Sequence, residues 1–215
     1  MFYQKIQKIN VKDEKLIKNL FKKIKLPKKK SHKGIPQEKI LEYVKEDDVI
    51  LIGVGMVRDK KPNFNSKVTF EEILKIKNEA HFAYFLLYYL LSHFPQKKFV
   101  IDAGALQMME KEWFYLLKEK VIITPHQKEF ANLFGLEIEN KTHEEKMKIV
   151  KEISKKYKTT IILKAVNDFI SDGKKNAIIV GGNQGLTKGG SGDVLAALAA
   201  SFFIKNSPFF ASVFA

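Results

Sequence analysis

Short apolar runs rich in β-branched residues alternate with helical patterns along most of the chain, and this alternation restricts the folds it can adopt. The runs that we expect to be strands are 48–55, 99–102, 121–124 and 160–164, followed by a hairpin of 169–173 and 177–180. Continuous apolar runs are typical of strands covered on both faces. Strands separated by helices at this spacing predict an α/β/α sandwich on a largely parallel sheet.

Amphipathic spacing predicts the helices between these strands. They are expected at 13–24, 37–45, 69–94, 105–117, 125–134 and 142–157, with further helices after the glycine-rich segment that follows the hairpin. Thr69 with Glu72 and Thr142 with Glu145 have the spacing of capping boxes, and Gly135 can end the helix before it. Because no internal repeat or long linker interrupts the pattern, we expect one domain, 1–215, with an N-terminal helix and connector at 1–34.

The composition narrows the class of protein. The chain has no cysteine, which excludes disulfides and thiolate nucleophiles and fits a reducing cytoplasm. Its longest apolar run, 82–91, is shorter than the roughly 20 residues of a spanning helix, so we expect a buried helix and no membrane contact. No signal peptide pattern precedes it. We therefore expect a cytoplasmic protein, and the oligomeric state, a homo-oligomer included, stays open.

The formal net charge of +14 raises the question of nucleic-acid binding. Only Arg58 is an arginine among the 38 basic residues, and the lysines are spread over ordinary amphipathic helices. Arginine is the usual reader of base edges, so its scarcity argues against sequence-specific nucleic-acid recognition. The positive charge is better explained as a compositional bias that also attracts anionic nucleotides.

A glycine-rich segment near the C-terminus carries the chemistry. Half of the chain's 12 glycines lie in 181–192, and Asp193 follows them where an apolar helix begins. Glycines let backbone approach a ligand closely, and a helix start suits a phosphate. A carboxylate in that turn can accept the proton of a hydroxyl beside the phosphate. This arrangement predicts phosphoryl transfer.

Polar or glycine residues follow the apolar runs at their carboxyl ends, where ligands bind in parallel sheets. They are Gly53, Gly55, Asp102, His126 and Lys164. We expect them at one rim together with the glycine-rich segment. Asp102 is expected to cap the following turn through its side chain, and Lys164 to contact an anionic ligand, since an ammonium rarely ends a buried strand without an anion.

Several motifs together resemble one family. In chain order they are Ser31-His32-Lys33-Gly34, Val100 to Leu106, Thr124-Pro125-His126-Gln127-Lys128-Glu129-Phe130, Leu163-Lys164-Ala165 and Gly189 to Leu195. They are similar to the ADP- or ATP-dependent NAD(P)H-hydrate dehydratases of the ribokinase-like superfamily. The resemblance covers most of 31–215 and implies a ribokinase-like three-layer α/β/α sandwich with a mostly parallel central sheet.

The resemblance implies an activity and a set of site residues. A nucleoside phosphate, ADP or ATP, would drive loss of water from the 6-hydroxyl of NADH or NADPH hydrate, with Asp193 acting at that hydroxyl. Glu129 would organise Mg²⁺ through water. The implied substrate positions are Gly55, His126 and Asp193. The implied nucleotide positions are Lys164, Ala165, Val166, Asn167, Asp168, Gly189, Gly190, Ser191 and Gly192.

The chain also departs from the family pattern. Val54 stands where the family has proline, Gly104 replaces a common second acid, and Ala165 replaces a glycine. Relative to that pattern we expect a sheet section to be missing after Gly34 and the C-terminal end to be absent. Two alternatives therefore stay open: a small-molecule kinase of the same superfamily, and a non-catalytic protein that binds nucleotides or polyanions.

Overall fold

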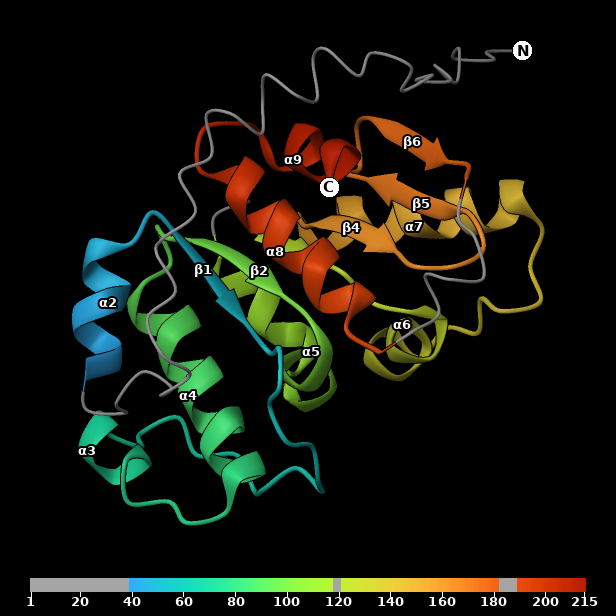
Figure 1. Ribbon diagram of the computed structural model, residues 1–215. Coiled ribbons are helices and arrows are strands. Elements are labelled where there is room, and N and C mark those ends of the chain that lie inside the picture. The colour runs from blue at the N-terminus through green and yellow to red at the C-terminus, as the bar shows by residue number, and fades with distance from the viewer. Residues whose placement is uncertain (1–38, 118–120, 182–188) are drawn as a thin grey trace.

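The computed structural model describes residues 39–117, 121–181 and 189–215. The expected helix at 13–24, the connector at 25–34 with its Ser31–Gly34 motif, and residues 182–188 of the glycine-rich segment lie outside these ranges. In the part that is described, no helix is both long enough and apolar enough to span a bilayer. The chain forms three layers, with a central sheet between two groups of helices (Figure 1).

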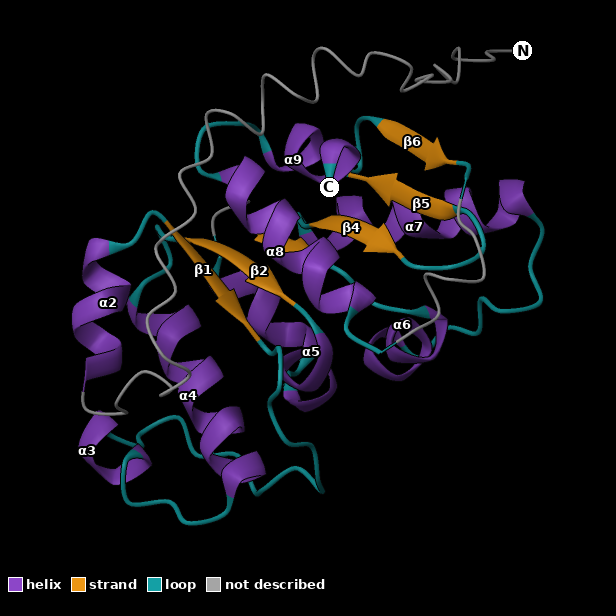
Figure 2. Cartoon of the chain, in the orientation of Figure 1, coloured by secondary structure: helices purple, strands orange, loops and turns teal. Residues whose placement is uncertain are grey.

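The sheet has six described strands in the order β1-β2-β3-β4-β5-β6. They are β1 (Val49–Ile52), β2 (Lys98–Ile101), β3 (Val121–Ile123), β4 (Thr160–Leu163), β5 (Asp168–Ser171) and β6 (Asn176–Ile179). The first four strands are parallel, and the predicted hairpin adds β5 antiparallel to β4 and β6 antiparallel to β5 (Figure 2). Ile101 lies beside both Ile52 and Ile123, so the parallel strands end nearly level. The mostly parallel sheet predicted from the sequence is confirmed.

Alternate residues of the strands enter two different cores, which explains the continuous apolar runs. In β2, Phe99 and Ile101 face the larger core, and Val100 faces the smaller one. The larger core is covered by α2 (Ile40–Glu46), α3 (Phe70–Ile73), α4 (Glu79–His93), α5 (Ala103–Met108), the 3₁₀ helix η2 (Lys111–Leu116), α6 (Gln127–Phe134) and α7 (His143–Tyr157). The smaller core lies under α8 (Ser191–Phe203) and α9 (Pro208–Phe214), which cross the near face of the sheet in Figure 1.

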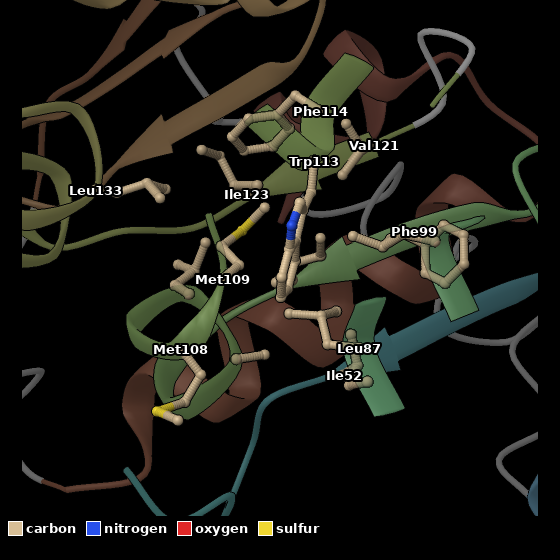
Figure 3. Close-up of a cluster of buried hydrophobic side chains, with 14 of the residues drawn as sticks. Ile52, Leu87, Phe99, Met108, Met109, Trp113, Phe114, Val121, Ile123 and Leu133 are labelled. Atoms are coloured by element: carbon tan, nitrogen blue, oxygen red, sulfur yellow. The ribbon is translucent and has the colours of Figure 1, made fainter. Parts of the chain in front are cut away.

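Trp113 lies in the larger core, among side chains from the sheet and the helices (Figure 3). Its ring meets that of Tyr84 edge-on at 4.9 Å between centroids, and it lies tilted against that of Tyr88 at 5.3 Å. Such edge-on arrangements stabilise aromatic pairs beyond the area they bury. The packing role predicted for Trp113 and the aromatic residues of 82–91 is confirmed, with α4 as the expected buried helix.

The single helix expected over 69–94 is wrong, because the structure divides it. Thr69 and Glu72 form the predicted capping box, but α3 ends at Ile73, and Asn78 then starts α4 by accepting a hydrogen bond from the His81 N–H. Asparagine is a strong N-cap residue, and its side chain offers the backbone an alternative to continuing the helix. The segment thus has two start signals, of which the prediction used one.

The helix expected over 105–117 also divides, into α5 and η2. Met109 is extended, with φ −71° and ψ 161°, and it is fully buried together with Trp113 and Phe114. Burial in the larger core outweighs the weak preference for continuing the helix. By contrast, α6 ends at Gly135 with φ 70°, and α7 begins with the Thr142–Glu145 capping box, both as predicted.

Candidate active site at the carboxyl edge of the sheet

Backbone hydrogen bonds continue from strand to strand past the end of the parallel ladder. The Asp102 N–H donates to the Ile52 carbonyl at 3.1 Å, and the Thr124 N–H donates to the Ile101 carbonyl at 3.2 Å. Beyond them, the Lys164 N–H donates to the Pro125 carbonyl at 2.8 Å. The residues that follow β1 to β4 therefore lie side by side along one edge of the sheet, where the sequence pattern placed them.

Lys164 and Asp102 form a buried ion pair across this edge. The Lys164 ammonium lies 2.8 Å from Asp102 Oδ1, although β3 separates their strands. Asp102 is 1% exposed, so its charge needs a partner. The expectation that Asp102 caps the next turn is wrong: it occupies the N-cap position of α5, but its side chain makes no cap hydrogen bond. The ammonium, and not the helix start, neutralises it.

The same ammonium lies against the N-terminus of α8. A Cβ built on Gly192 would come within 3.4 Å of Lys164 Nζ. The N-cap residue of α8 is Gly190, with φ 96°, which has no side chain to accept from the first-turn amides. A helix start and a lysine side chain are both positive, so together they favour an anion. Among the residues that the structure describes, nothing lies within 4 Å of a Cβ built on Gly189 or Gly190.

Asp193 lies in the first turn of α8, one residue after Gly192, and is exposed. Within 39–117, 121–181 and 189–215 it has no hydrogen-bond or ion-pair partner. The helix is held on the sheet by Ala196, Ala199 and Phe203, which enter the smaller core further along its length. The carboxylate is thus presented at the rim by a helix that is anchored elsewhere.

His126 and Glu129 start α6 with a capping box. The Glu129 N–H donates to His126 Nδ1 at 3.2 Å, and the His126 N–H donates to Glu129 Oε2 at 2.9 Å. Because Nδ1 accepts a hydrogen bond, the neutral imidazole must carry its proton on Nε2. The His126 side chain is 49% exposed. Its Nε2 lies 3.6 Å from Glu129 Oε1, too far for a hydrogen bond, so the half-exposed ring can offer this N–H to a ligand at the rim.

Two further residues extend this network, and the sequence analysis missed both as site residues. Gln107 Nε2 donates to Glu129 Oε1 at 2.9 Å, and Arg58 Nη1 donates to Gln107 Oε1 at 3.1 Å. Arg58 belongs to the loop that follows β1, and Gln107 to α5. That Arg58 is the chain's one arginine could have marked it as a candidate site residue. In the sequence it was used only as an argument against nucleic-acid binding.

The glycines after β1 have different functions in the fold. Gly53, with φ 119°, leaves no room for a side chain, because a Cβ there would overlap the Asp102 carbonyl. Gly55, with φ 73°, has no neighbour within 4 Å of a built Cβ in the described part of the chain. A Cβ on Gly104 would overlap the Met56 carbonyl, so this glycine lets the loop after β1 close on α5.

Residues 165–167 form the turn from β4 to β5, directly after Lys164. The Ala165 N–H donates to Asp168 Oδ1 at 3.0 Å, and Val166 is 90% exposed. Asn167 lies 3.4 Å from His143 Nε2. Burial raises the pKa of Asp168, although the Ala165 N–H and the Lys164 charge both oppose this. The implied nucleotide contacts of 165–168 stay a prediction.

Glu129 is predicted to organise Mg²⁺ through water, and this role stays a prediction. It is 5% exposed, and its two carboxylate oxygens already accept from the His126 N–H and from Gln107. In the described part of the chain, no three carboxylate or imidazole groups gather where a metal ion would need them. Mg²⁺ is commonly held by substrate phosphates with few protein ligands. We therefore derive no step through a metal.

The structure brings most of the predicted site residues to one edge of the sheet. Gly192, Lys164 and Asp102 form one continuous group, and His126, Glu129, Gln107 and Arg58 form another. The backbone bond between Lys164 and Pro125 joins the two groups. The roles assigned to these residues in binding and catalysis stay predictions.

Comparison with known proteins identifies the family. A family model described as NAD(P)H-hydrate dehydratase matches residues 6–215. A bifunctional NAD(P)H-hydrate repair enzyme from Archaeoglobus fulgidus is 32% identical over 80% of this chain and 29% of its own length. An ADP-dependent (S)-NAD(P)H-hydrate dehydratase from Enterococcus faecalis is 31% identical over 79% of this chain and 50% of its own length.

A solved structure supports the same relationship. A ribokinase-like superfamily protein from Enterococcus faecalis superposes with a TM-score of 0.62 and 27% identity, covering 84% of this chain and 58% of that protein. The chain spans half or less of the two curated relatives. By sequence motif, family model and fold, the chain belongs to the NAD(P)H-hydrate dehydratase family.

Proposed function

We propose that this protein dehydrates NADH or NADPH hydrate back to the reduced dinucleotide, at the expense of ADP or ATP. The observation that carries the proposal is the position of the Lys164 ammonium, 3.4 Å from where a Cβ on Gly192 would lie, at the start of α8 and one residue before Asp193. It combines a site for phosphate with a carboxylate that can accept the proton of the substrate hydroxyl to which the phosphoryl group is transferred. The functions of the two curated relatives support the same reaction.

Hydroxide is a poor leaving group, so the 6-hydroxyl is first converted into a better one. Asp193 accepts the hydroxyl proton while the oxygen attacks the terminal phosphorus of the nucleotide, and the bond to the bridging oxygen of the nucleotide breaks. The C6–O bond then breaks with release of phosphate, and a proton leaves C5 to form the ring double bond. The products are NAD(P)H, phosphate, and the nucleotide shortened by one phosphate.

The other rim residues bind and orient the two substrates. The first-turn amides of α8 and the Lys164 ammonium would hold the terminal phosphates. These donors are in position before charge develops on the phosphoryl group in the transition state. His126 would donate its Nε2–H to the hydrated dinucleotide, beside the open backbone at Gly55. The turn at 165–168 would contact the rest of the nucleotide. Mg²⁺ would enter with the nucleotide phosphates, and we place the reaction in the cytoplasm.

The test is recovery of dihydronicotinamide absorbance when hydrated NADH or NADPH is incubated with the protein, Mg²⁺ and ADP or ATP. We expect recovery only when a nucleotide is present. Asp193→Asn should lower kcat by about 100-fold or more, the usual effect of removing a general base, and leave nucleotide binding within about twofold. Asp48→Asn removes an exposed carboxylate at the opposite edge of the sheet and should leave both unchanged.

Three results would contradict the proposal. Absence of any recovered absorbance with both nucleotides would do so. Equal turnover by wild type and Asp193→Asn would remove the carboxylate from the mechanism. A stable phosphorylated alcohol in mass spectra, formed without dihydronicotinamide, would favour the small-molecule kinase instead.

A further inference from the structure

We propose that Arg58 binds the diphosphate group of the hydrated dinucleotide, and that Gln107 is its positioning residue. The inference rests on the proposed function and adds a second anion site to it. Lys164 and the α8 N-terminus serve the nucleotide phosphates at one end of the rim. Arg58 lies at the other end of the row of contacts, beyond His126 and Glu129.

Arg58 is connected to the substrate side of the site by an unbroken chain of hydrogen bonds. Glu129 joins His126 to Gln107, and Gln107 joins Glu129 to Arg58, with the last two bonds at 2.9 and 3.1 Å. Arg58 itself follows Gly55 by three residues on the loop after β1. The guanidinium is therefore tied to the same residues that hold the His126 ring in place.

The donors and acceptors available in these side chains fix the direction of each hydrogen bond between Glu129 and Arg58. An ionised Glu129 can only accept, so the side-chain amide of Gln107 must turn its NH₂ toward Glu129 and its oxygen toward Arg58. That oxygen engages one guanidinium nitrogen, whereas the group carries five N–H donors. Arg58 is exposed, and in the described residues no carboxylate forms an ion pair with it. Most of its donors are thus directed at solvent from an anchored position.

The choice of residue supports a phosphate ligand. Of the 38 basic residues, only this one is arginine, and it stands at the rim of the site. Lysine supplies a point charge, whereas the planar guanidinium can bind two phosphate oxygens at once. The hydrated dinucleotide carries a diphosphate a few bonds from its reacting ring. With the ring between Asp193 and His126, the exposed side of this network is where that diphosphate can reach a cation.

The experiment compares Arg58→Gln, Arg58→Lys and Lys60→Gln with wild type. Lys60 is an exposed cation two residues away and provides the control for net charge. Removing a charge-assisted bond to substrate should raise KM for the hydrate by about tenfold or more in Arg58→Gln. Because the diphosphate does not react, kcat and the nucleotide KM should stay within about twofold. Arg58→Lys should recover part of the loss, and Lys60→Gln should match wild type.

Using both hydrates identifies the phosphate that is bound. The diphosphate is common to NADH hydrate and NADPH hydrate, so the KM should rise by the same factor for each. A rise confined to NADPH hydrate would assign Arg58 to the 2′-phosphate and overturn the proposal. An unchanged KM, a rise matched by Lys60→Gln, or a rise in the nucleotide KM would also overturn it.

Gln107→Ala tests the positioning role separately. It leaves the guanidinium charge in place but unanchored, so the hydrate KM should rise less than in Arg58→Gln, with kcat unchanged. In a double variant with Arg58→Gln the hydrate KM should rise by less than the product of the two single effects, since part of the effect of Gln107→Ala passes through Arg58. An additive effect would overturn this role.

Direct binding separates failure of this inference from failure of the proposed reaction. NADH and NADPH share the diphosphate, and their fluorescence reports binding without turnover. If wild type binds them and Arg58→Gln binds them about tenfold more weakly, the anion site stands even where no dehydration is seen. Equal binding by both proteins would overturn it, whatever the activity of the wild type.

Discussion

At the scale of single residues, Lys164 and Asp102 serve both the fold and the site. The pair neutralises a buried carboxylate and at the same time fixes an ammonium under the start of α8. Its two members are unequally buried: the Lys164 side chain is 21% exposed, and that of Asp102 is 1% exposed. Loss of either partner leaves the other without its counter-ion, but only Lys164 has access to water.

This asymmetry predicts unequal costs for two near-isosteric substitutions. Lys164→Met, which leaves Asp102 buried and unpaired, should lower the free energy of unfolding by about 3 kcal/mol. Asp102→Asn should cost about 1 kcal/mol, since the ammonium keeps a hydrogen-bond acceptor and partial hydration. Urea denaturation of the single and double variants measures both, and the double variant should lose less than the sum. Equal costs, or a larger cost for Asp102→Asn, would contradict the assigned burial.

The two glycines after β1 give a second prediction at this scale. Gly53→Ala places a methyl group on the Asp102 carbonyl, so the loop or β2 must move, and we expect a loss of about 3 kcal/mol or more in stability. Gly55→Ala meets only the strain of its positive φ, about 1 kcal/mol. Thermal unfolding distinguishes them. A larger loss of stability in Gly55→Ala than in Gly53→Ala would contradict the open surroundings assigned to Gly55.

The sequence was a good guide to which residues stand at the rim, but not to their contacts. Strand ends are local features, so Lys164, Asp102 and His126 could be placed from the pattern. The partner of Asp102 is 62 residues away, and Gln107 and Arg58 are 49 residues apart. Pairings over such separations depend on strand order and loop closure, which a single chain pattern does not contain. A local cap was therefore predicted for Asp102 where a distant ammonium binds.

At the scale of elements, helix starts with two agreeing signals were predicted correctly. α7 has a threonine N-cap and a glutamate three residues later, and both cap bonds form, at 3.2 and 2.8 Å. The divided helices show the limit of this approach. Asn78 is a single signal inside an otherwise helical pattern, and the break at Met109 comes from burial in the larger core, which has no local signal.

The α7 capping box predicts a dependence of stability on pH. Its hydrogen bond from the Thr142 backbone lowers the pKa of Glu145 below the ordinary value. The ionised carboxylate therefore stabilises the fold above the ordinary pKa, and this contribution is lost as the pH falls through the lowered one. Glu145→Gln should flatten the acid limb of the stability curve measured by urea denaturation. Glu144→Gln, in the same turn, provides the control and should retain the slope; loss of slope in both would contradict the prediction.

Thr142→Ala tests the other half of the same box. Removing the hydroxyl that accepts from the Glu145 N–H should lower the free energy of unfolding by about 1 kcal/mol, the usual cost of losing an N-cap. Urea denaturation near neutral pH measures it. Thr142→Ser keeps the acceptor and should stay close to wild type; a matching loss in Thr142→Ser would show that the methyl group, and not the cap, carries the effect.

At the scale of the whole molecule, the two cores hold different parts of the candidate site in place. The larger core holds the helices that carry Gln107, His126 and Glu129, and the smaller core holds α8 with Asp193. The site lies where these two layers meet the end of the sheet. Its geometry therefore depends on both cores, and the docking of α8 is secured at its far end by Lys98, which donates to the Phe203 and Ile204 carbonyls.

Tyr84, in the larger core, makes the stability of the protein depend on pH in the alkaline range. It is 1% exposed, its hydroxyl donates to Glu110 at 3.4 Å, and Glu110 in turn pairs with Lys61 at 3.2 Å. Burial, reinforced by the Glu110 charge and hydrogen bond, raises the pKa of Tyr84 to about 12. An unfolded tyrosine titrates near pH 10.

The unfolded state thus loses this proton first as the pH rises. Tyr84 contributes its full stability below about pH 10, and the contribution disappears as the pH approaches about 12. Lysine titration acts on the same limb, so the informative quantity is the difference between variants. In urea denaturation at a series of alkaline pH values, Tyr84→Phe should lose less stability than wild type as the pH rises. Tyr43→Phe, an exposed tyrosine, should follow wild type; a parallel decline in Tyr84→Phe would show that the buried hydroxyl does not govern the alkaline response.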